Sequence, residues 1–174
     1  MKAAVVHDGK LYLFVHGTDD FMTNAWSTVD GVNWELAGGS PLNDMDNFSL
    51  VSFKGKLWIF GGDNVYGSTS QVWSTEDGKY FRKEADSVLA NGRFGASFIA
   101  YQDALLITGG SDRDGFFYPE IWGSEDGAMW RYIRLDPALK PRRSARLLEY
   151  HDKLWLFGGW NPETLLLGDA WRSP

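Results

Sequence analysis

The sequence predicts an all-β chain of about four four-stranded antiparallel sheets, the last of them incomplete. Three observations favour this fold class. Aromatic residues make up 16% of the 174 residues and glycine occurs 20 times, which is typical of short, tightly turned strands. A four-residue apolar run anchored on a leucine recurs at a period of about 48 residues. A glycine pair, a tryptophan and an Asp-Gly pair follow that run in a constant order.

These markers divide the chain into four repeats, at residues 1–44, 45–92, 93–141 and 142–174, within a single domain. The anchoring leucines are Leu11, Leu57, Leu105 and Leu154. The glycine pairs are Gly61-Gly62, Gly109-Gly110 and Gly158-Gly159, the tryptophans are Trp26, Trp73, Trp122 and Trp171, and the Asp-Gly pairs are Asp30-Gly31, Asp77-Gly78 and Asp126-Gly127. Because the markers share one period, we expect each repeat to form one structural unit.

Each repeat is expected to contain four strands. An apolar run such as 50–53 or 98–101 forms the first strand, and the leucine-anchored run forms the second after a tight turn. The third strand carries the tryptophan. Asp-Gly is a strong hairpin signal and leads into the fourth strand, which carries Trp34, Phe81 or Trp130. The first two strands are apolar at nearly every position, so both faces of each sheet are expected to be buried, as in the radial blades of a β-propeller.

The glycine pair Gly61-Gly62 after an apolar strand, followed by Trp73 and Phe81, resembles the kelch-type, galactose-oxidase-like β-propellers. The segments 73–78 and 122–127 are also similar to the Asp-box hairpins of sialidase-like propellers, although Asp and Gly are adjacent here and are usually separated by one residue there. The mixture is similar to the kelch-like repeats of uncharacterised bacterial propeller proteins. Propellers carry many unrelated activities, so the resemblance implies a fold more strongly than a function.

Three repeats are complete, and the fourth stops after Trp171, before any Asp-Gly pair. An open arc of blades would leave a sheet face and strand edges exposed. We therefore expect a piece of a longer propeller or a unit that a second copy completes, with self-association or completion by further blades.

Composition excludes several classes of function. The formal net charge of −6 disfavours nucleic acid as a partner. The chain has no cysteine, which removes thiolate metal sites, a cysteine nucleophile and the copper chemistry of galactose oxidase. The three histidines have no metal-ligand spacing, so we expect no metal and no cofactor. No run is long enough to span a membrane and no signal peptide is recognisable, which leaves the compartment open: cytoplasmic by default, extracytoplasmic for a fragment of a secreted protein.

Residues present in every repeat are expected to serve the blade. On this argument Asp30, Asp77 and Asp126 accept local backbone N–H bonds in their hairpins, and the tryptophans pack against a neighbouring blade. Residues that differ between repeats are better candidates for binding.

One variable position lies twelve residues before the anchoring leucine and holds Met45, Arg93 or Arg142. We expect it at the mouth of the central channel. Arg146 stands where other repeats have Ser49 and Ser97. Such arginines could clamp a carboxylate or phosphate, and the alternative is an ion pair with an acidic residue of the adjacent blade.

The loops between the second and third strands are the other variable feature. Aromatic and charged residues on these loops, namely Asp112, Phe116, Tyr118 and Trp160, suit ligand or partner binding. Capping of a blade interface is the alternative role.

The sequence shows no catalytic motif and favours a non-enzymatic kelch-like module that binds a protein or a small anionic or carbohydrate ligand. One alternative is a carbohydrate-active enzyme, either a sialidase-like glycosidase or a sialic-acid isomerase of the kelch type. A scaffold without a role of its own is the third possibility.

Overall fold

Four small antiparallel sheets make up the computed structural model, which describes residues 3–16, 22–42, 45–133 and 139–174. No helix occurs in these ranges. Blade 1 contains β1 (Ala3–His7), β2 (Lys10–His16), β3 (Thr23–Thr28) and β4 (Glu35–Gly39), and blade 2 contains β5 (Ser49–Phe53), β6 (Lys56–Phe60), β9 (Val72–Thr75) and β10 (Arg82–Ala85). Blade 3 contains β11 (Ser97–Tyr101), β12 (Ala104–Thr108), β13 (Ile121–Ser124) and β14 (Arg131–Ile133), and blade 4 contains β15 (Arg146–Tyr150), β16 (Lys153–Phe157) and β19 (Ala170–Arg172).

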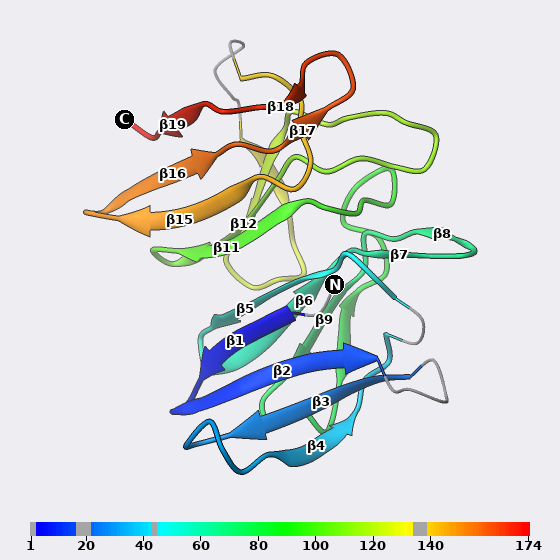
Figure 1. The fold of residues 1–174 in the computed structure, drawn as a ribbon, viewed down its shortest axis with the longest axis vertical. Coiled ribbons are helices and arrows are strands. Elements are labelled where there is room, and N and C mark those ends of the chain that lie inside the picture. The colour runs from blue at the N-terminus through cyan, green and yellow to red at the C-terminus, as the bar shows by residue number, and fades with distance from the viewer. Residues whose placement is uncertain (1–2, 17–21, 43–44, 134–138) are drawn as a thin grey trace.

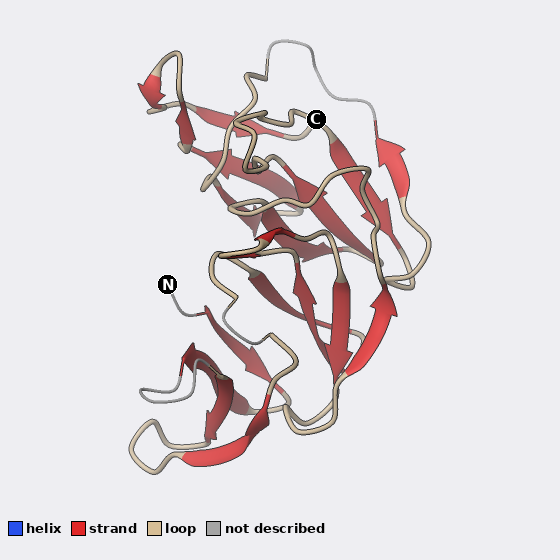
Figure 2. Cartoon of the chain, turned by 90° about the vertical axis from the view of Figure 1, so that its right-hand side faces the viewer, coloured by secondary structure: helices blue, strands red, loops and turns tan. Residues whose placement is uncertain are grey.

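The four sheets are arranged as a four-bladed β-propeller, as the sequence predicts. The first strand of each blade is innermost, and the blades follow one another along an arc from blade 1 at the bottom of Figure 1 to blade 4 at the top (Figures 1 and 2). The innermost strands of successive blades lie against each other, β1 with β5, β5 with β11 and β11 with β15. In this described part of the chain, β15 and β1 do not pack in the same way.

Two short hairpins were not anticipated from the sequence. β7 (Asp63–Asn64) pairs with β8 (Gly67–Ser68), and β17 (Trp160–Asn161) pairs with β18 (Leu165–Leu166). Both lie in the connections between the second and third strands of their blades. These connections are therefore partly ordered by backbone pairing.

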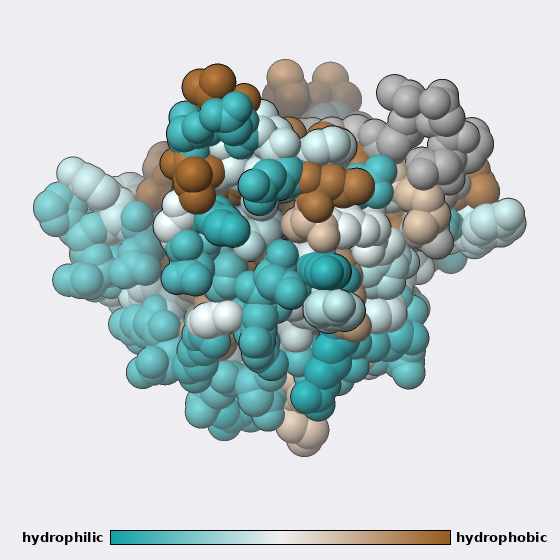
Figure 3. Space-filling view, turned by 90° about the horizontal axis from the view of Figure 1, so that it is seen from below, coloured by the Kyte–Doolittle hydropathy of each residue, from teal (hydrophilic) through white to brown (hydrophobic). Residues whose placement is uncertain are grey.

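The hydrophobic core lies between blades. We call the side of a blade that faces the next blade its leading face, and the opposite side its trailing face. Tyr12 and Phe14 on the leading face of blade 1 pack with Leu57 and Ile59 on the trailing face of blade 2. A second cluster repeats the arrangement between blades 2 and 3, with Trp58, Phe60, Leu105 and Ile107. The underside of the molecule is mainly hydrophilic, and hydrophobic residues gather along one edge of that view (Figure 3).

The Asp-Gly hairpins are held by side-chain to backbone bonds, as expected. Oδ1 of Asp126 accepts from the N–H groups of Ala128 at 2.9 Å and Met129 at 2.8 Å, and the Ser124 hydroxyl accepts from the Gly127 N–H at 2.8 Å. The bonds from Met129 and Ala128 hold the pKa of the Asp126 carboxyl below its usual value. The same bonds occur around Asp30 and Asp77.

Most of the repeated aromatic residues pack against the preceding blade. Trp73 and Phe81 contact the cluster between blades 1 and 2, and Trp122 and Trp130 contact the cluster between blades 2 and 3. The expectation of burial was wrong for Trp34, which is 37% exposed. Trp34 follows the hairpin of blade 1, whose trailing face has no blade before it in the described residues.

Among the residues described, none forms a helix with the length and hydropathy of a membrane span.

Candidate functional site

A cleft of about 410 Å³ lies at the centre of the propeller. Its walls come from the innermost strand of every blade and from the turns before those strands. The strand residues are Ala3, Ala4, Ser49, Leu50, Ser97, Phe98, Arg146 and Leu147, and the turn residues are Asn47, Phe48, Gly95, Ala96, Ser144 and Ala145. A volume of this size is within the range of small-molecule sites, roughly 300–1,000 Å³.

The rim of the cleft is built by a turn that repeats in blades 2, 3 and 4. Asn47, Gly95 and Ser144 adopt positive φ angles of 54°, 64° and 56°. The Gly95 N–H donates to the Asn47 carbonyl at 3.3 Å, and the Ser144 N–H donates to the Gly95 carbonyl at 2.7 Å. These bonds link successive blades and bring the first residue of each innermost strand to the cleft.

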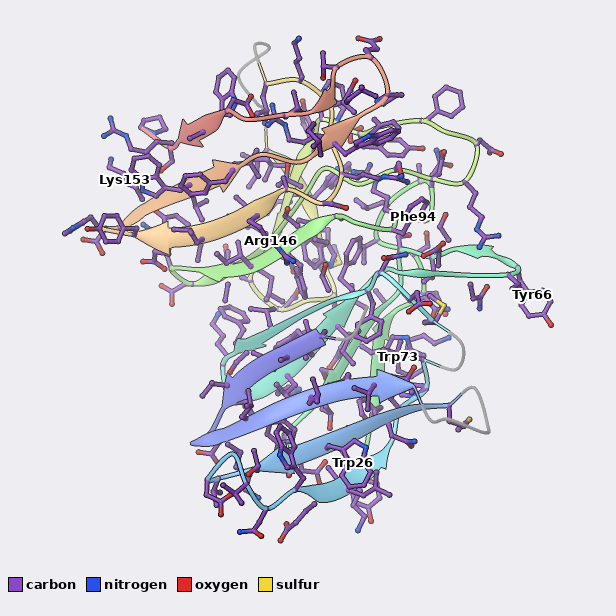
Figure 4. The ribbon with its side chains drawn as sticks, in the orientation of Figure 1. Trp26, Tyr66, Trp73, Phe94, Arg146 and Lys153 are labelled. Carbon is purple, nitrogen blue, oxygen red and sulfur yellow. The ribbon has the colours of Figure 1, made fainter. Side chains whose placement is uncertain are left out.

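Arg146 is the first residue of β15 and lies near the centre of the molecule, between the blades at the top and those at the bottom (Figure 4). The serines at its position in other blades tie those blades together: Ser49 Oγ donates to the Ala96 carbonyl at 2.7 Å, and Ser97 Oγ donates to the Ala145 carbonyl at 2.8 Å. The Arg146 side chain is exposed, and no hydrogen bond or ion pair joins its guanidinium to another described residue. Its guanidinium is therefore available to a ligand in the cleft.

Arg93 is 3% exposed and lies inside blade 3. Its Nη2 is 3.0 Å from Oε2 of Glu120, and its guanidinium stacks at 3.9 Å on the ring of Tyr118. Burial lowers the pKa of the guanidinium, and the Glu120 carboxylate opposes that shift. Arg93 thus joins the segment before β11 to the segment before β13.

Arg142 is 2% exposed and makes a bidentate ion pair with Asp169. Nη1 donates to Oδ1 at 2.6 Å and Nη2 donates to Oδ2 at 2.9 Å. Nε donates to the Lys140 carbonyl at 3.0 Å, and Nη1 also donates to the Gly158 carbonyl at 2.9 Å. The bonds from Arg142 are the main reason why the pKa of the Asp169 carboxyl falls to about 2.

The sequence places these two arginines at the channel mouth, but neither Arg93 nor Arg142 lines the cleft. Each side chain turns back into its own blade, toward the residue two positions before the third-strand tryptophan. The acidic partner also differs from the alternative that the sequence suggested. Glu120 and Asp169 belong to the same repeat as their arginine and not to the adjacent blade. Both acids were missed in the sequence analysis.

Asp112 and Tyr118 meet Arg93 in one polar cluster of the third repeat. Tyr118 Oη donates to Oδ2 of Asp112 at 2.5 Å, and Asn91 Nδ2 donates to Tyr118 Oη at 2.6 Å. The Phe116 N–H donates to Oδ1 of Asp112 at 3.0 Å, which closes the loop. Burial and the bond to Asp112 raise the pKa of Tyr118. These contacts order the loop, while the Phe116 side chain is 65% exposed.

Trp160 lies apart from that cluster and belongs to an aromatic group around Arg143. The Arg143 guanidinium lies 4.6 Å from the Trp160 ring, 5.1 Å from the Phe94 ring and 5.8 Å from the Phe117 ring. The sequence-predicted candidates thus occupy four places: the cleft with Arg146, the Arg93 cluster, the Arg142 pair and the Trp160 group. Within the described ranges, no three His, Asp or Glu residues are arranged to hold a metal ion.

No protein-family model matches the sequence, and no curated protein matches it. Among solved structures, the chain is similar to one described as "Structure of YjhT", with a TM-score of 0.78 and 17% sequence identity. The match covers 97% of this chain and 64% of that one, so the chain spans less than two thirds of the length of that solved structure. At this identity the similarity concerns the β-propeller fold alone.

Proposed function

We propose that the chain is a non-enzymatic, kelch-like propeller module that binds a small anionic ligand, such as an acidic carbohydrate, in the central cleft. The observation that supports this most directly is the exposed Arg146 on the wall of a cleft of about 410 Å³. A guanidinium presents planar donors that match a carboxylate or phosphate, and the low-dielectric walls strengthen that contact.

The rest of the wall suits the neutral part of such a ligand. Ser49 and Ser97 each donate their hydroxyl proton to a carbonyl of the next blade, so their oxygens remain acceptors for ligand hydroxyl groups. Leu50, Phe98 and Leu147 add apolar surface. A carboxylated sugar carries all three kinds of group.

A carbohydrate-active enzyme remains the alternative proposal. Hydrolysis of a glycosidic bond generally uses two carboxylates beside the substrate, and in a sialidase-like site a tyrosine takes the place of the carboxylate nucleophile. The described residues that line the cleft include no Asp or Glu, and the acids that accompany Arg93 and Arg142 are engaged inside their blades. No observation favours this alternative over binding.

Protein binding is a second candidate function, favoured by the tips of the connections between second and third strands. Tyr66 is 92% exposed at the tip of the β7–β8 hairpin and projects away from the propeller (Figure 4). Phe116 and Leu166 are 65% and 83% exposed on the equivalent connections of blades 3 and 4. Exposed aromatic and aliphatic side chains on ordered loops are typical of contact surfaces.

The test of the cleft uses D-glucuronate as the probe and D-glucose as its neutral counterpart, with binding followed by saturation-transfer NMR and titration calorimetry. We expect glucuronate to bind the chain and to bind Arg146→Gln at least about tenfold more weakly, because a charge-assisted contact contributes about 1.5–3 kcal/mol. Arg131→Gln is the matched control, since Arg131 is exposed on β14 and pairs with Glu125 at 2.9 Å. Equal affinity of glucuronate for the chain and for Arg146→Gln would refute the proposal.

A further inference from the structure

The leading face of blade 4 is exposed, whereas the corresponding face of blade 2 is buried. On blade 2, Phe53, Trp58 and Phe60 are 7%, 4% and 1% exposed. At the same register positions of blade 4, Tyr150 and Phe157 are 59% and 38% exposed, and Trp155 is only half-buried. Figure 1 shows β15 and β16 at the end of the arc.

The two faces carry nearly the same residues and share one indole hydrogen bond. Residues 56–60 read Lys-Leu-Trp-Ile-Phe and residues 153–157 read Lys-Leu-Trp-Leu-Phe. Trp58 Nε1 donates to the Phe53 carbonyl at 3.0 Å, and Trp155 Nε1 donates to the Tyr150 carbonyl at 3.2 Å. The indole of blade 4 therefore makes the same hydrogen bond as the buried indole of blade 2, although it is only half-buried.

At the interfaces between blades 1 and 2 and between blades 2 and 3, the Asp-Gly hairpin of the following blade covers the leading aromatic residue. A Cβ added to Gly127 of blade 3 would lie 1.9 Å from the Trp58 ring, and one added to Gly78 of blade 2 would lie 3.0 Å from the Tyr12 ring. Gly31 of blade 1 has nothing within 4 Å. At Gly78 and Gly127, the hairpin backbone lies so close to an aromatic ring of the preceding blade that a side chain would clash with the ring.

The backbone shows the same periodicity. The Gly62 N–H donates to the Arg93 carbonyl at 3.0 Å, and the Gly110 N–H donates to the Arg142 carbonyl at 2.9 Å. Gly159 is the equivalent residue of blade 4 and has a φ of 107°, close to the 108° of Gly62. No described residue accepts from its N–H. Blade 4 therefore presents a backbone donor, a fixed indole and a phenyl ring in the pattern that blade 2 uses to bind blade 3.

We propose that the leading face of blade 4 is a docking surface for a further four-stranded blade of this repeat type. The Asp-Gly glycine of that blade lies on Trp155, its apolar trailing strand covers Phe157, and one of its carbonyls accepts from the Gly159 N–H. The proposal extends the interface between blades 2 and 3 to a face with the same residues. It is independent of the ligand proposed for the cleft.

The test uses an extended chain in which a second copy of residues 76–141 is joined after Ser173. Ser173 lies two residues after the third-strand tryptophan, as Thr75 and Ser124 do in blades 2 and 3, so the added copy continues blade 4 in the register of the repeat. The added segment supplies an outer strand to blade 4 and then a second copy of blade 3, the natural neighbour of a Trp58-type face. Hydroxyl-radical footprinting measures oxidation of each side chain. We expect the oxidation rate of Trp155 to fall severalfold relative to the original chain, while that of Trp34 on blade 1 stays unchanged.

The matched control changes the glycine that should contact Trp155. Gly127→Val in the added copy alone should restore oxidation of Trp155, because a side chain there has no room against the indole. Equal oxidation of Trp155 in the original and extended chains overturns the proposal. An added copy that stays unfolded, as judged by circular dichroism, also overturns it, since the face should stabilise its blade. Protection of Trp155 that rises with the concentration of the original chain overturns it in favour of a second copy as occupant.

Discussion

Arg93 in blade 3 and Arg142 in blade 4 occupy the same place in their repeats, but their ion pairs differ in the number of nitrogens that the acid reaches. Asp169 reaches both terminal nitrogens of Arg142, and its Oδ2 also accepts from Trp171 Nε1 at 2.7 Å. Glu120 approaches Arg93 at a single distance of 3.0 Å. In the described structure, Arg93 Nε and Trp122 Nε1 are buried without a hydrogen-bond partner, and the buried Glu120 Oε2 has no partner besides the ion-pair contact with Arg93.

A buried ion pair is expected to stabilise a blade only when its geometry satisfies the surrounding donors. The shorter aspartate aligns with both the guanidinium and the indole, so the desolvation cost of Arg142 is offset by directed bonds. The longer glutamate leaves polar atoms unpaired, and stacking on Tyr118 replaces part of the lost interaction. We therefore expect the two arginines to differ strongly in their effect on stability.

The largest effect is expected for Arg142→Ala. The substitution removes the pair with Asp169 and the bonds to the carbonyls of Lys140 and Gly158. The free energy of unfolding should fall by about 3 kcal/mol, the lower end for a broken buried pair, because water can solvate the released carboxylate. Urea unfolding at pH 7 measures the change. Arg131→Ala, on an exposed pair, should change it by no more than about 1 kcal/mol.

Asp169→Asn should sharpen the comparison through pH. The bonds from Arg142 lower the pKa of Asp169 to about 2, so its contribution is fully present above the usual carboxyl pKa near 4 and is lost as the pH falls toward 2. The variant should be about 1.5 kcal/mol less stable than the original chain at pH 7. The gap should close between pH 4 and pH 2 in urea titrations. Asp114→Asn, an exposed loop change, serves as the control, and a gap that persists at pH 2 contradicts the assignment.

Arg93→Met should have a smaller effect than Arg142→Met. Met45 already occupies this place in blade 2, where it is 8% exposed, and a thioether can replace the guanidinium stacking on Tyr118. Made together with Glu120→Gln, which copies the neutral Gln71 of blade 2 and leaves no buried carboxylate unpaired, the substitution should change the free energy of unfolding by no more than about 1 kcal/mol. A loss as large as that of Arg142→Met, measured in the same urea experiment, would show that the Arg93 pair is equally stabilising.

The sequence predicted the fold from local signals. The period of the leucine-anchored strands, the glycine pairs and the Asp-Gly hairpins is set by backbone conformation and burial, and these act within one repeat. Trp34 was predicted to be buried because the same marker is buried in later blades. Its exposure depends on the absence of a preceding blade in the described structure, which no residue near Trp34 encodes.

The site was less predictable because it depends on the direction of side chains. Arg146 was singled out by its replacement of a serine, and it does lie in the cleft. The acidic partners of Arg93 and Arg142 could also be predicted from the sequence. The residue two positions before the third-strand tryptophan is Glu120 or Asp169 in the repeats that contain these arginines, and the neutral Gln71 in the repeat that contains Met45. Charge at the two positions therefore changes together.

The smallest effect is expected for Trp122→Phe. The indole N–H of Trp122 is buried without a partner, so its removal relieves an unsatisfied donor and offsets the loss of ring area. Trp171→Phe instead removes the 2.7 Å bond to Asp169, so it should lower the free energy of unfolding by about 1 kcal/mol more than Trp122→Phe does. Thermal unfolding of both variants measures the difference. Combining Trp171→Phe with Asp169→Asn isolates that bond, because the two changes should then be less than additive. Equal losses for Trp122→Phe and Trp171→Phe would mean that ring packing, and not the fit of the acid, separates the two blades.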